Sequence, residues 1–468
     1  MRTLIRLALL AVLLPLASQP GWADAGSSIK SNQFFRAENV NGRWWLISPD
    51  GHRFISKGVT TVDRAPDVIH GTDKSPYLET NEVKYRNPVA WRKAVATRLI
   101  GWGFNSLGAW SDEAVSEIVV DNQRLAYTPL VDLGADFVSG KHKGAAWLHG
   151  IFPDVFDPDF ELMAHQFARE RCGPRAGDRW LLGWFTDNEL RWGPDWRGSD
   201  ELLTMFLALP ESVPGKKAAV DLMRERYGDV KKFNAVWNTT FGSWDELSRT
   251  NAIHAPVVRE AIYLQNQETE RQANEADPKR AAFVADCGAF LARLAERYFR
   301  ITSEAIRVAD PNHMNFGCRF AYVPPQPVIA AVAKYVDAIS FNCYRLDPRE
   351  VISRYSAFGK PLIIGEFSFR SLDSGLPNTK GAGPKVETQV ERAAAFKNFV
   401  TLALQNPNLV GYHWFEHCDQ PKEGRFDGEN SNYGVVNVRD EVYQDLTRAM
   451  TEINAKAETL HEGAVESK

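Results

Sequence analysis

The feature that most constrains the fold is a regular alternation of short apolar segments with helical segments along most of the chain. Eight segments have the near-continuous apolar character of strands that are buried on both faces. They span residues 54–59, 104–110, 125–133, 180–189, 314–320, 337–344, 361–369 and 409–416. Between several of these segments, apolar residues recur at helical spacing. For example, Trp91, Val95 and Leu99 follow the capping residue Asn87.

This alternation predicts an α/β fold with a parallel sheet covered by helices. Eight strands match the count of a closed (β/α)8 barrel, the TIM barrel. A doubly wound open sheet is the alternative, but no G-x-G-x-x-G motif follows the first strand as it often does in such sheets. Two turn signals, Asn41-Gly42 and Asp50-Gly51, also predict a short β-hairpin segment ahead of the first barrel strand.

The alternation pauses between the fourth and fifth strands, where the sequence is helical in character. The helices expected in this stretch span residues 216–227, 230–237 and 279–308. We therefore expect one barrel over residues 26–456, with a large helical insertion at 190–312 and a C-terminal tail at 457–468. No linker or internal repeat divides the chain further.

The first 25 residues have the pattern of an export signal. Arg2 and Arg6 precede the apolar segment 7–16, and Ala23-Asp24-Ala25 offers a small-residue cleavage site. The apolar segment is too short to span a membrane. We expect a secreted or periplasmic protein that has no membrane association after the signal is removed.

Composition excludes one class of partner. The chain of 468 residues has 55 Lys+Arg against 59 Asp+Glu, a net charge of −4, so it lacks the basic surface that binds nucleic acid. Its five scattered cysteines do not form a disulfide framework, although a Cys318–Cys343 bridge stays open. His413 and His417 lie in a strand and the loop after it, which gives no fixed metal geometry. We expect neither a metal nor a cofactor.

Polar and reactive residues follow the predicted strands. In a barrel the active site lies at the C-terminal ends of the strands. These ends carry Asp187-Asn188-Glu189 (fourth), Arg319 (fifth), Asn342-Cys343-Tyr344 (sixth), Glu366 (seventh) and His413-Trp414-Phe415-Glu416 (eighth). The pattern predicts a site at this end of the barrel.

Two of these carboxylates suit the hydrolysis of a glycosidic bond. One carboxyl protonates the leaving oxygen, and the other attacks the anomeric carbon at a separation of about 5–5.5 Å or activates a water at about 6.5–9.5 Å. We predict Glu189 and Glu366 as the pair. Asp187 is a rival that strand alternation would place on the same side as Glu189, one layer deeper. Tyr344 could donate to the nucleophile, and Asn188 could bind a sugar hydroxyl.

The chain resembles a known family at these positions. Asn188-Glu189, Tyr344, Glu366 and Trp414 after strands four, six, seven and eight resemble the large clan of retaining glycosidases on (β/α)8 barrels. Longer segments are similar to the bacterial beta-agarase family: WWLISPDGH (44–52), GFNSLGAW (103–110), GWFTDNEL (183–190), GEFSF (365–369), DQP (419–421), GR (424–425) and DGEN (427–430). A motif within 227–244 is also similar to bacterial beta-galactosidases of this clan. The resemblance implies that Glu189 is the acid/base, that Glu366 is the nucleophile, and that the substrate is a beta-linked, galactose-containing saccharide.

The resemblance has one departure. Typical agarases carry a β-rich carbohydrate-binding region ahead of the barrel, whereas only about 30 residues separate the expected cleavage site from the first strand here, too few for a domain. A soluble oligosaccharide or another beta-galactan therefore stays open as the substrate. The pattern is also compatible with a beta-galactosidase, with a different beta-glycosidase, or with a non-catalytic carbohydrate-binding barrel. The presence of both carboxylates disfavours the last of these.

Further residues near the strand ends are candidates for binding the sugar. Five aromatic residues lie at or just beyond strand ends, where a ring could stack on a sugar: Trp110, Trp192, Trp196, Trp414 and Phe415. Trp91 and Trp102 instead lie on a helix face and are expected in the core. Polar candidates are Arg319, Glu416, Asp427, Glu429 and Asn430. The sequence leaves the oligomeric state open.

Overall fold

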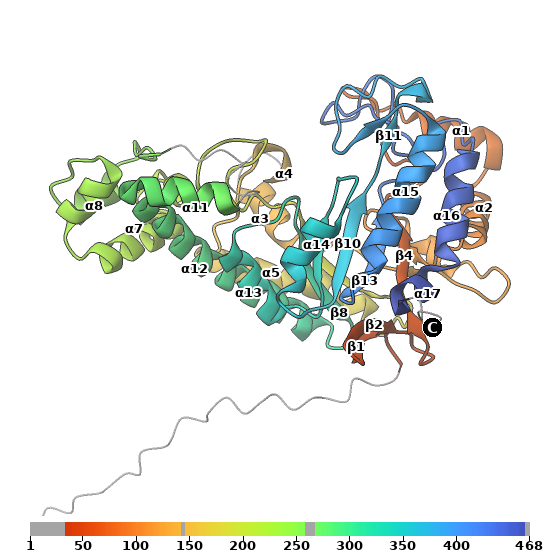
Figure 1. The fold of residues 1–468 in the computed structure, drawn as a ribbon, viewed down its shortest axis with the longest axis horizontal. Helices are drawn as coiled ribbons and strands as arrows, with labels where there is room; N and C mark the ends of the chain where they lie inside the picture. The colour runs from red at the N-terminus through yellow and green to blue at the C-terminus, as the bar shows by residue number, and fades with distance from the viewer. Residues whose placement is uncertain (1–32, 142–145, 258–266, 464–468) are drawn as a thin grey trace, which may run out of the picture.

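The computed structural model describes residues 33–141, 146–257 and 267–463. Eight parallel strands alternate with helices along the chain (Figure 1). The strands are β4 (Ser56–Val59), β5 (Ser106–Leu107), β6 (Ala126–Tyr127), β7 (Gly183–Asn188), β8 (Met314–Arg319), β9 (Ile339–Asn342), β10 (Leu362–Phe367) and β13 (Leu409–Trp414). Each lies within one of the eight predicted segments. The predicted export signal lies outside the described residues.

The strand pairings run in the cyclic order of a barrel. Six strands pair in the order β6-β5-β4-β13-β10-β9, and β7 pairs with β8. Isolated parallel bridges supply the two remaining links, Tyr127 with Leu181 between β6 and β7, and Phe320 with Phe341 between β8 and β9. The predicted α/β fold with a parallel sheet is therefore confirmed, and these bridges connect its strands around a ring.

Helices cover the outside of the strands. They are α2 (Pro88–Gly101), α5 (Pro158–Arg171), α13 (Gln326–Tyr335), α14 (Arg349–Ser356), α15 (Gln389–Leu404) and α16 (Gln444–Asn454). The first shows why the sequence forms these helices: the Asn87 side chain accepts a hydrogen bond from the Ala90 N–H at 2.9 Å, and Pro88 occupies the first helical position. Its Trp91 and Leu99 are buried against the barrel, as predicted.

Short elements lie in the connections between the strands and the covering helices. They are α1 (Pro76–Tyr85), α3 (Leu133–Lys141), α4 (Ala146–His149), α17 (Ala457–Glu462), the two-residue strands β11 (Arg370–Ser371) and β12 (Lys385–Val386), and 3-10 turns at Glu113–Glu117, Gly173–Arg175 and Leu372–Ser374. The sequence did not predict α1, because Tyr77 and Asn81 are its only buried residues and it has no apolar stripe. The predicted tail contains α17, whose His461 is buried.

A small antiparallel sheet lies at the N-terminal end of the barrel. It consists of β1 (Arg36–Val40), β2 (Arg43–Ile47) and β3 (Arg53–Phe54), joined at the predicted hairpin turns. Phe35 and Leu46 of this segment share one buried cluster with Met314, Ile363 and Val410 of the barrel strands. This sheet therefore packs against the end of the barrel opposite the strand termini that carry polar residues.

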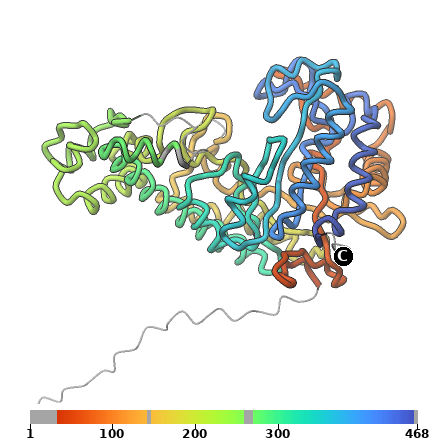
Figure 2. The backbone as a smooth tube through the Cα atoms, in the orientation of Figure 1, coloured from red at the N-terminus to blue at the C-terminus, as the bar shows by residue number. Residues whose placement is uncertain are grey.

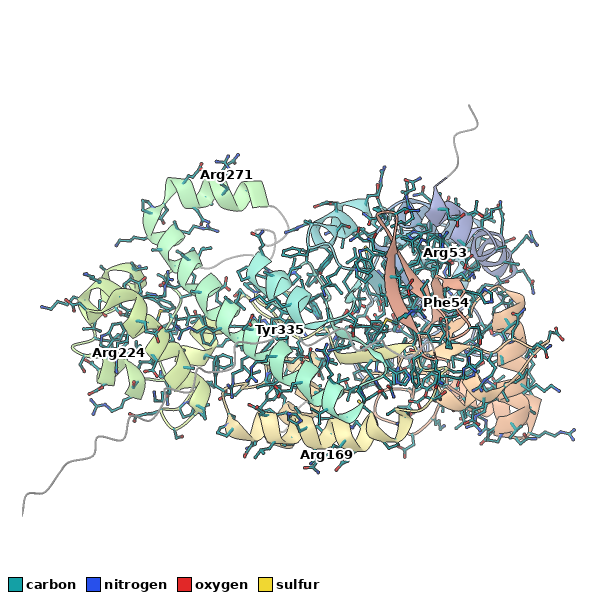
Figure 3. All side chains as sticks on the ribbon, turned by 90° about the horizontal axis from the view of Figure 1, so that it is seen from below. Arg53, Phe54, Arg169, Arg224, Arg271 and Tyr335 are labelled. Carbon is teal, nitrogen blue, oxygen red and sulfur yellow. The ribbon has the colours of Figure 1, made fainter. Side chains whose placement is uncertain are left out.

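The predicted insertion forms a helical lobe beside the barrel (Figure 2). Its helices are α6 (Leu202–Leu207), α7 (Pro214–Tyr227), α8 (Val230–Trp237), α9 (Trp244–Arg249), α11 (Gln267–Ala276) and the long α12 (Pro278–Ala309). Figure 3 shows Arg224 and Arg271 of this lobe far from Arg53 and Phe54 of the small sheet. Asp286, in the first half of α12, accepts hydrogen bonds from Tyr227 and Trp237 at 2.6 and 2.9 Å and so ties the lobe together.

The second half of α12 returns to the barrel. There the hydroxyl of Tyr298 donates to Asp187 on β7 at 2.5 Å, and Asn315 on β8 donates to Ser303 at 2.8 Å. The 32-residue helix α12 therefore serves both units, because one end packs in the lobe and the other covers β7 and β8.

Two further expectations concern cysteines and membranes. All five cysteines are buried and none forms a disulfide, so Cys318 and Cys343 are not bridged. None of the helices among the described residues is both long and apolar enough to cross a membrane.

Candidate active site

A cavity of about 930 Å³ opens at the C-terminal ends of the barrel strands. Its lining includes eight residues predicted from the sequence: Trp110, Asn188, Glu189, Trp196, Tyr344, Glu366, Phe415 and Glu429. The other six predicted residues, Trp192, Arg319, Trp414, Glu416, Asp427 and Asn430, are not part of this lining. A cavity therefore lies at the predicted end of the barrel, but six of the predicted residues do not line it.

Glu366 lies on strand β10 and is held by groups from the two preceding strands. Its Oε1 is 2.9 Å from Nη2 of the Arg319 guanidinium, an ion pair that lacks hydrogen-bond geometry, and its Oε2 accepts a hydrogen bond from the Tyr344 hydroxyl at 2.6 Å. Burial raises the pKa of Glu366 to about 7, against the opposing effects of Arg319 and Tyr344, while the nearby charge of Glu189 raises it further. Arg319 and Tyr344 therefore favour the ionised form of this carboxyl.

Glu189 lies one residue beyond the end of β7 and is held by neutral donors. Its Oε1 accepts from the Asn342 amide at 2.8 Å, and its Oε2 accepts from the indole N–H of Trp147 at 2.7 Å. Its backbone N–H donates to the carbonyl of Arg319 at 2.8 Å. The side chain is 8% exposed, so the carboxyl faces the cavity from a mostly buried position.

Asn342 is a neighbour of both Glu189 and Glu366. It is the register partner of Glu366 on the neighbouring strand, where paired residues lie about 4.8 Å apart. Its amide also donates to Glu189. Asn342 therefore connects the two positions, because its side chain binds Glu189 and its backbone lies beside that of Glu366.

Asp187 has a structural position rather than a place in the cavity. Its carboxyl accepts hydrogen bonds from the backbone N–H groups of Gly134 and Ala135 at the start of α3 and from the Tyr298 hydroxyl. The expectation that it shares a side with Glu189 is wrong, because the register shifts between Phe185 and Asn188 and the strand ends before Glu189.

Four lining residues other than glycine have strained backbones, namely Thr61, Asp132, Trp110 and Glu189. Glu189 has a φ of 51° and Trp110 a φ of 60°, in the left-handed region that side chains larger than glycine rarely adopt. Such strain persists where the surrounding structure enforces it, and it is concentrated at functional sites. In Glu189 and Trp110 it occurs where a barrel strand has just ended.

The structure corrects the prediction that Trp414 and Trp192 stack on a sugar. Trp414 is fully buried, packs edge-on against Phe367 and donates to the Tyr433 carbonyl at 2.9 Å. Trp192 is 6% exposed and stacks on Phe299 of α12. Neither ring has a free face, because each fills space between the barrel strands and the surrounding helices. Trp110 is different, since it is 40% exposed and lines the cavity over the Arg319 guanidinium.

Arg319 and Glu416 are also buried below the cavity. Arg319 is fully buried and reaches the nucleophile candidate Glu366, so it acts on that carboxyl rather than on a ligand. Glu416 is fully buried, and neither of its oxygens has a hydrogen-bond partner among the described residues. Burial, followed by the nearby Asp67 carboxyl, holds the pKa of Glu416 well above its usual range.

Several charged side chains in the polar loop after β13 pair with one another. Arg425 pairs with Asp427 at 3.0 Å and with Glu429 at 2.9 Å, and the Asn430 side chain accepts from the Thr379 backbone N–H at 2.9 Å. Of the three predicted residues in this loop, only Glu429 lines the cavity. Asp427 and Asn430 are used to shape the loop.

Sequence reasoning missed two contacts of Glu189. Trp147 lies in the four-residue helix α4, which has no periodicity that would mark it. Arg197 lies in the loop after β7, and its Nη1 donates to the carbonyls of both Glu189 and Trp147. The only available signal was proximity to Glu189 in the chain, which applies to Arg197 and not to Trp147.

Groups of three or more metal-ligating side chains do not come together in the described part of the chain. His413 is buried in the barrel beside Ser56, at 2.8 Å. His417 packs against Tyr77 and Trp91. Burial lowers the pKa of both imidazoles to about 3.

The chain is similar to beta-agarases over most of its length, which confirms the resemblance found in the sequence. Beta-agarase B of Vibrio sp. (strain JT0107) is 28% identical over 500 residues, which cover 93% of this chain and 49% of that protein. Beta-agarase A of the same strain is 28% identical over 483 residues, covering 90% of this chain and 45% of that protein. The chain thus spans about half the length of these relatives.

The solved structures lead to the same class. The structure of an exo-beta-agarase superposes with a TM-score of 0.73 at 26% sequence identity, covering 93% of this chain and 66% of that one. A search of protein-family models finds no match.

Proposed function

We propose that this protein is an exported retaining glycoside hydrolase that cleaves beta-galactosidic bonds in a neutral galactan such as agarose or its oligosaccharides. The observation that carries the proposal is that Glu189 and Glu366 line one cavity, where the Asn342 side chain donates to Glu189 and its backbone pairs with that of Glu366. Residues 26–456 form the catalytic unit, and residues 1–25 direct export. The agarase relatives support the choice of substrate.

In the first step Glu366 attacks the anomeric carbon. Arg319 and Tyr344 hold its carboxylate ionised and fix the direction of its oxygens. The protonated Glu189 gives its proton to the glycosidic oxygen, so the C–O bond breaks and the leaving sugar departs as an alcohol. The product of this step is a galactosyl ester of Glu366.

In the second step the roles of Glu189 reverse. Its carboxylate removes a proton from a water, which attacks the anomeric carbon and releases Glu366. Two inversions at one carbon give net retention. Asn342 and Trp147 donate to Glu189 and hold the carboxyl in place through both steps.

The charge of the cavity favours a neutral substrate. Its described lining contains seven carboxyl groups and three guanidinium groups. Burial raises the pKa of five of these carboxyls, so the lining becomes net negative as the pH rises above those values, and an anionic sugar such as a galactose sulfate is then disfavoured. Uncharged hydroxyls bind to such a surface by accepting and donating hydrogen bonds.

Hydrolysis of a panel of substrates tests this function. Purified protein is assayed against aryl beta-galactosides, agarose, agarose oligosaccharides and neutral beta-glucans, alongside Glu366→Ala and Glu189→Ala. We expect turnover of the galactosides and of agarose or its oligosaccharides, and loss in both variants. Preference for a beta-glucan would reassign the substrate. Undiminished turnover in either variant would overturn the assignment of the two carboxyls.

A further inference from the structure

Three aromatic side chains lie around Glu189, and two of them, Trp196 and Tyr322, have no part in the two steps above. Trp147, Trp196 and Tyr322 all line the cavity, on loops that follow β6, β7 and β8. Their rings form a chain, with centroids 6.3 Å apart between Trp147 and Trp196 and 5.3 Å apart between Trp196 and Tyr322. Trp196 is 51% exposed and Tyr322 is 40% exposed. These rings are the aromatic wall.

The aromatic wall is connected to Glu189 by Arg197. Its guanidinium Nη1 donates to the Trp147 carbonyl at 2.8 Å and to the Glu189 carbonyl at 2.9 Å. The same guanidinium lies 4.2 Å from the centre of the Trp196 ring. Arg197 and its ion-pair partner Asp195 are 4% and 5% exposed. A single buried cation therefore fixes the backbone of Glu189, the helix that carries Trp147 and one face of Trp196.

The reaction determines what lies beside Glu189. An acid that protonates the glycosidic oxygen must touch the leaving group, while the nucleophile attacks the opposite face of the anomeric carbon. Rings next to Glu189 are therefore placed on the leaving-group side of the bond. A half-exposed indole among carboxyls suits a ligand that has an apolar face and hydroxyl edges, as a neutral sugar ring has.

We propose that the aromatic wall is the binding site for the leaving-group sugar, and that Arg197 is the positioning residue that aligns this site with Glu189. This inference rests on the proposed function, since it assumes that Glu189 is the acid. It adds a binding site for the leaving-group sugar and assigns separate roles to Trp196 and Arg197. Trp196 binds the sugar that departs, and Arg197 sets the distance between that sugar and the acid.

The experiment compares two substrate types that share one galactose and differ in the leaving group. An aryl beta-galactoside with a good leaving group needs neither a sugar contact nor strong acid assistance, whereas an oligosaccharide needs both. In Trp196→Ala, kcat/KM for the oligosaccharide should fall by about tenfold or more, while the value for the aryl galactoside changes by less than about twofold. Trp196→Phe keeps a ring and should restore most of the loss.

The positioning role of Arg197 has its own readout. In Arg197→Lys, the rate should depend more steeply on the leaving-group pKa across a series of aryl galactosides, because a displaced acid helps poor leaving groups least. Arg191→Lys is the matched control. Arg191 is also buried and donates to the Gly193 and Gly198 carbonyls of the same loop, but it does not touch Glu189. It should leave that slope unchanged.

Each outcome decides one claim. Equal losses on both substrate types in Trp196→Ala, or no loss on either, would overturn the leaving-group site. An unchanged slope in Arg197→Lys, or the same change in Arg191→Lys, would overturn the positioning role. Failure of the unmodified protein to hydrolyse any galactoside would instead overturn the proposed function, so the two failures are distinguishable.

Discussion

The two carboxyls of the cavity are held in different ways. Glu366 lies within a barrel strand, and its neighbours Arg319 and Tyr344 come from the ends of the two preceding strands. Glu189 lies beyond its strand in a left-handed conformation, and two of its contacts, Trp147 and Arg197, come from loops. The sheet therefore positions one carboxyl and the loops position the other.

This difference suits the two proposed roles. A nucleophile must be aimed at one carbon and kept ionised, which a charged partner on a rigid strand provides. An acid/base must follow a leaving group that varies between substrates, and loops are where barrels of this class vary. Changes to the strand-borne contacts should alter the pH dependence, and changes to the loop-borne contacts should alter leaving-group dependence.

Removing either carboxyl should have the largest effect on turnover, and the two variants should distinguish the nucleophile from the acid/base. Glu366→Ala should lose turnover by about 10⁴-fold or more, and Glu189→Ala by about 10²–10⁴-fold on poor leaving groups. With azide added, the first should release an alpha-galactosyl azide and the second a beta-galactosyl azide from an aryl galactoside. Product analysis by NMR checks this, and the opposite assignment of anomers would exchange the two roles.

Removing the charge beside Glu366 should shift the pH profile. The nucleophile must be ionised, and its pKa of about 7 predicts that kcat/KM falls as the pH drops through about 7. Arg319 lowers this pKa, so Arg319→Gln should move the acid limb to higher pH by about one unit or more. Tyr344→Phe should move it in the same direction by less. A shift to lower pH in either variant would refute the claim that they stabilise the carboxylate.

The negative lining predicts a preference among galactans. At low ionic strength, kcat/KM for a neutral oligosaccharide should exceed that for its sulfated counterpart by about tenfold, and added salt should narrow the gap. Reducing-end assays of both substrates over a series of salt concentrations measure this ratio of kcat/KM values. A sulfated substrate that is hydrolysed equally well at low salt would contradict the electrostatic account.

The burial of Glu366 predicts a smaller effect, on stability. Its folded-state pKa of about 7 lies above the usual value of 4.5, so the ionised form is disfavoured in the folded state. Stability from this group is full below pH 4.5 and is lost as the pH rises to about 7. Glu366→Gln removes that loss, so the variant should gain about 1 kcal/mol per pH unit over this window relative to the unmodified protein. Thermal unfolding at pH 5 and pH 7 measures it, with Glu304→Gln on the surface as a control. A gain that does not grow with pH would contradict the burial argument.

The same contrast explains which parts could be predicted from the sequence. Strands buried on both faces have a simple apolar signature, so all eight were found, and the barrel rule then placed Glu366 and Tyr344 at its mouth. Side-chain direction at a strand end is harder to predict. Trp414 is the last residue of β13, and the register of that strand points its ring into the core.

Loop-borne residues had no comparable signal. Trp147 meets Glu189 across a loop separation of 42 residues, and no periodicity in the sequence marks such a contact. Arg197 looks like any charged loop residue until its two carbonyl partners are seen. The sequence could therefore predict the part of the site that the sheet positions, and not the part that tertiary loop contacts position.

The anomeric configuration of the first product tests the central claim most directly. The two-carboxylate mechanism places Glu366 as a nucleophile, so a beta-galactoside should be released first as the beta-anomer, which then mutarotates. Proton NMR during the first minutes of hydrolysis distinguishes the two anomers. Initial appearance of the beta-anomer is the predicted result. Initial appearance of the alpha-anomer would show that water, and not Glu366, attacks the anomeric carbon.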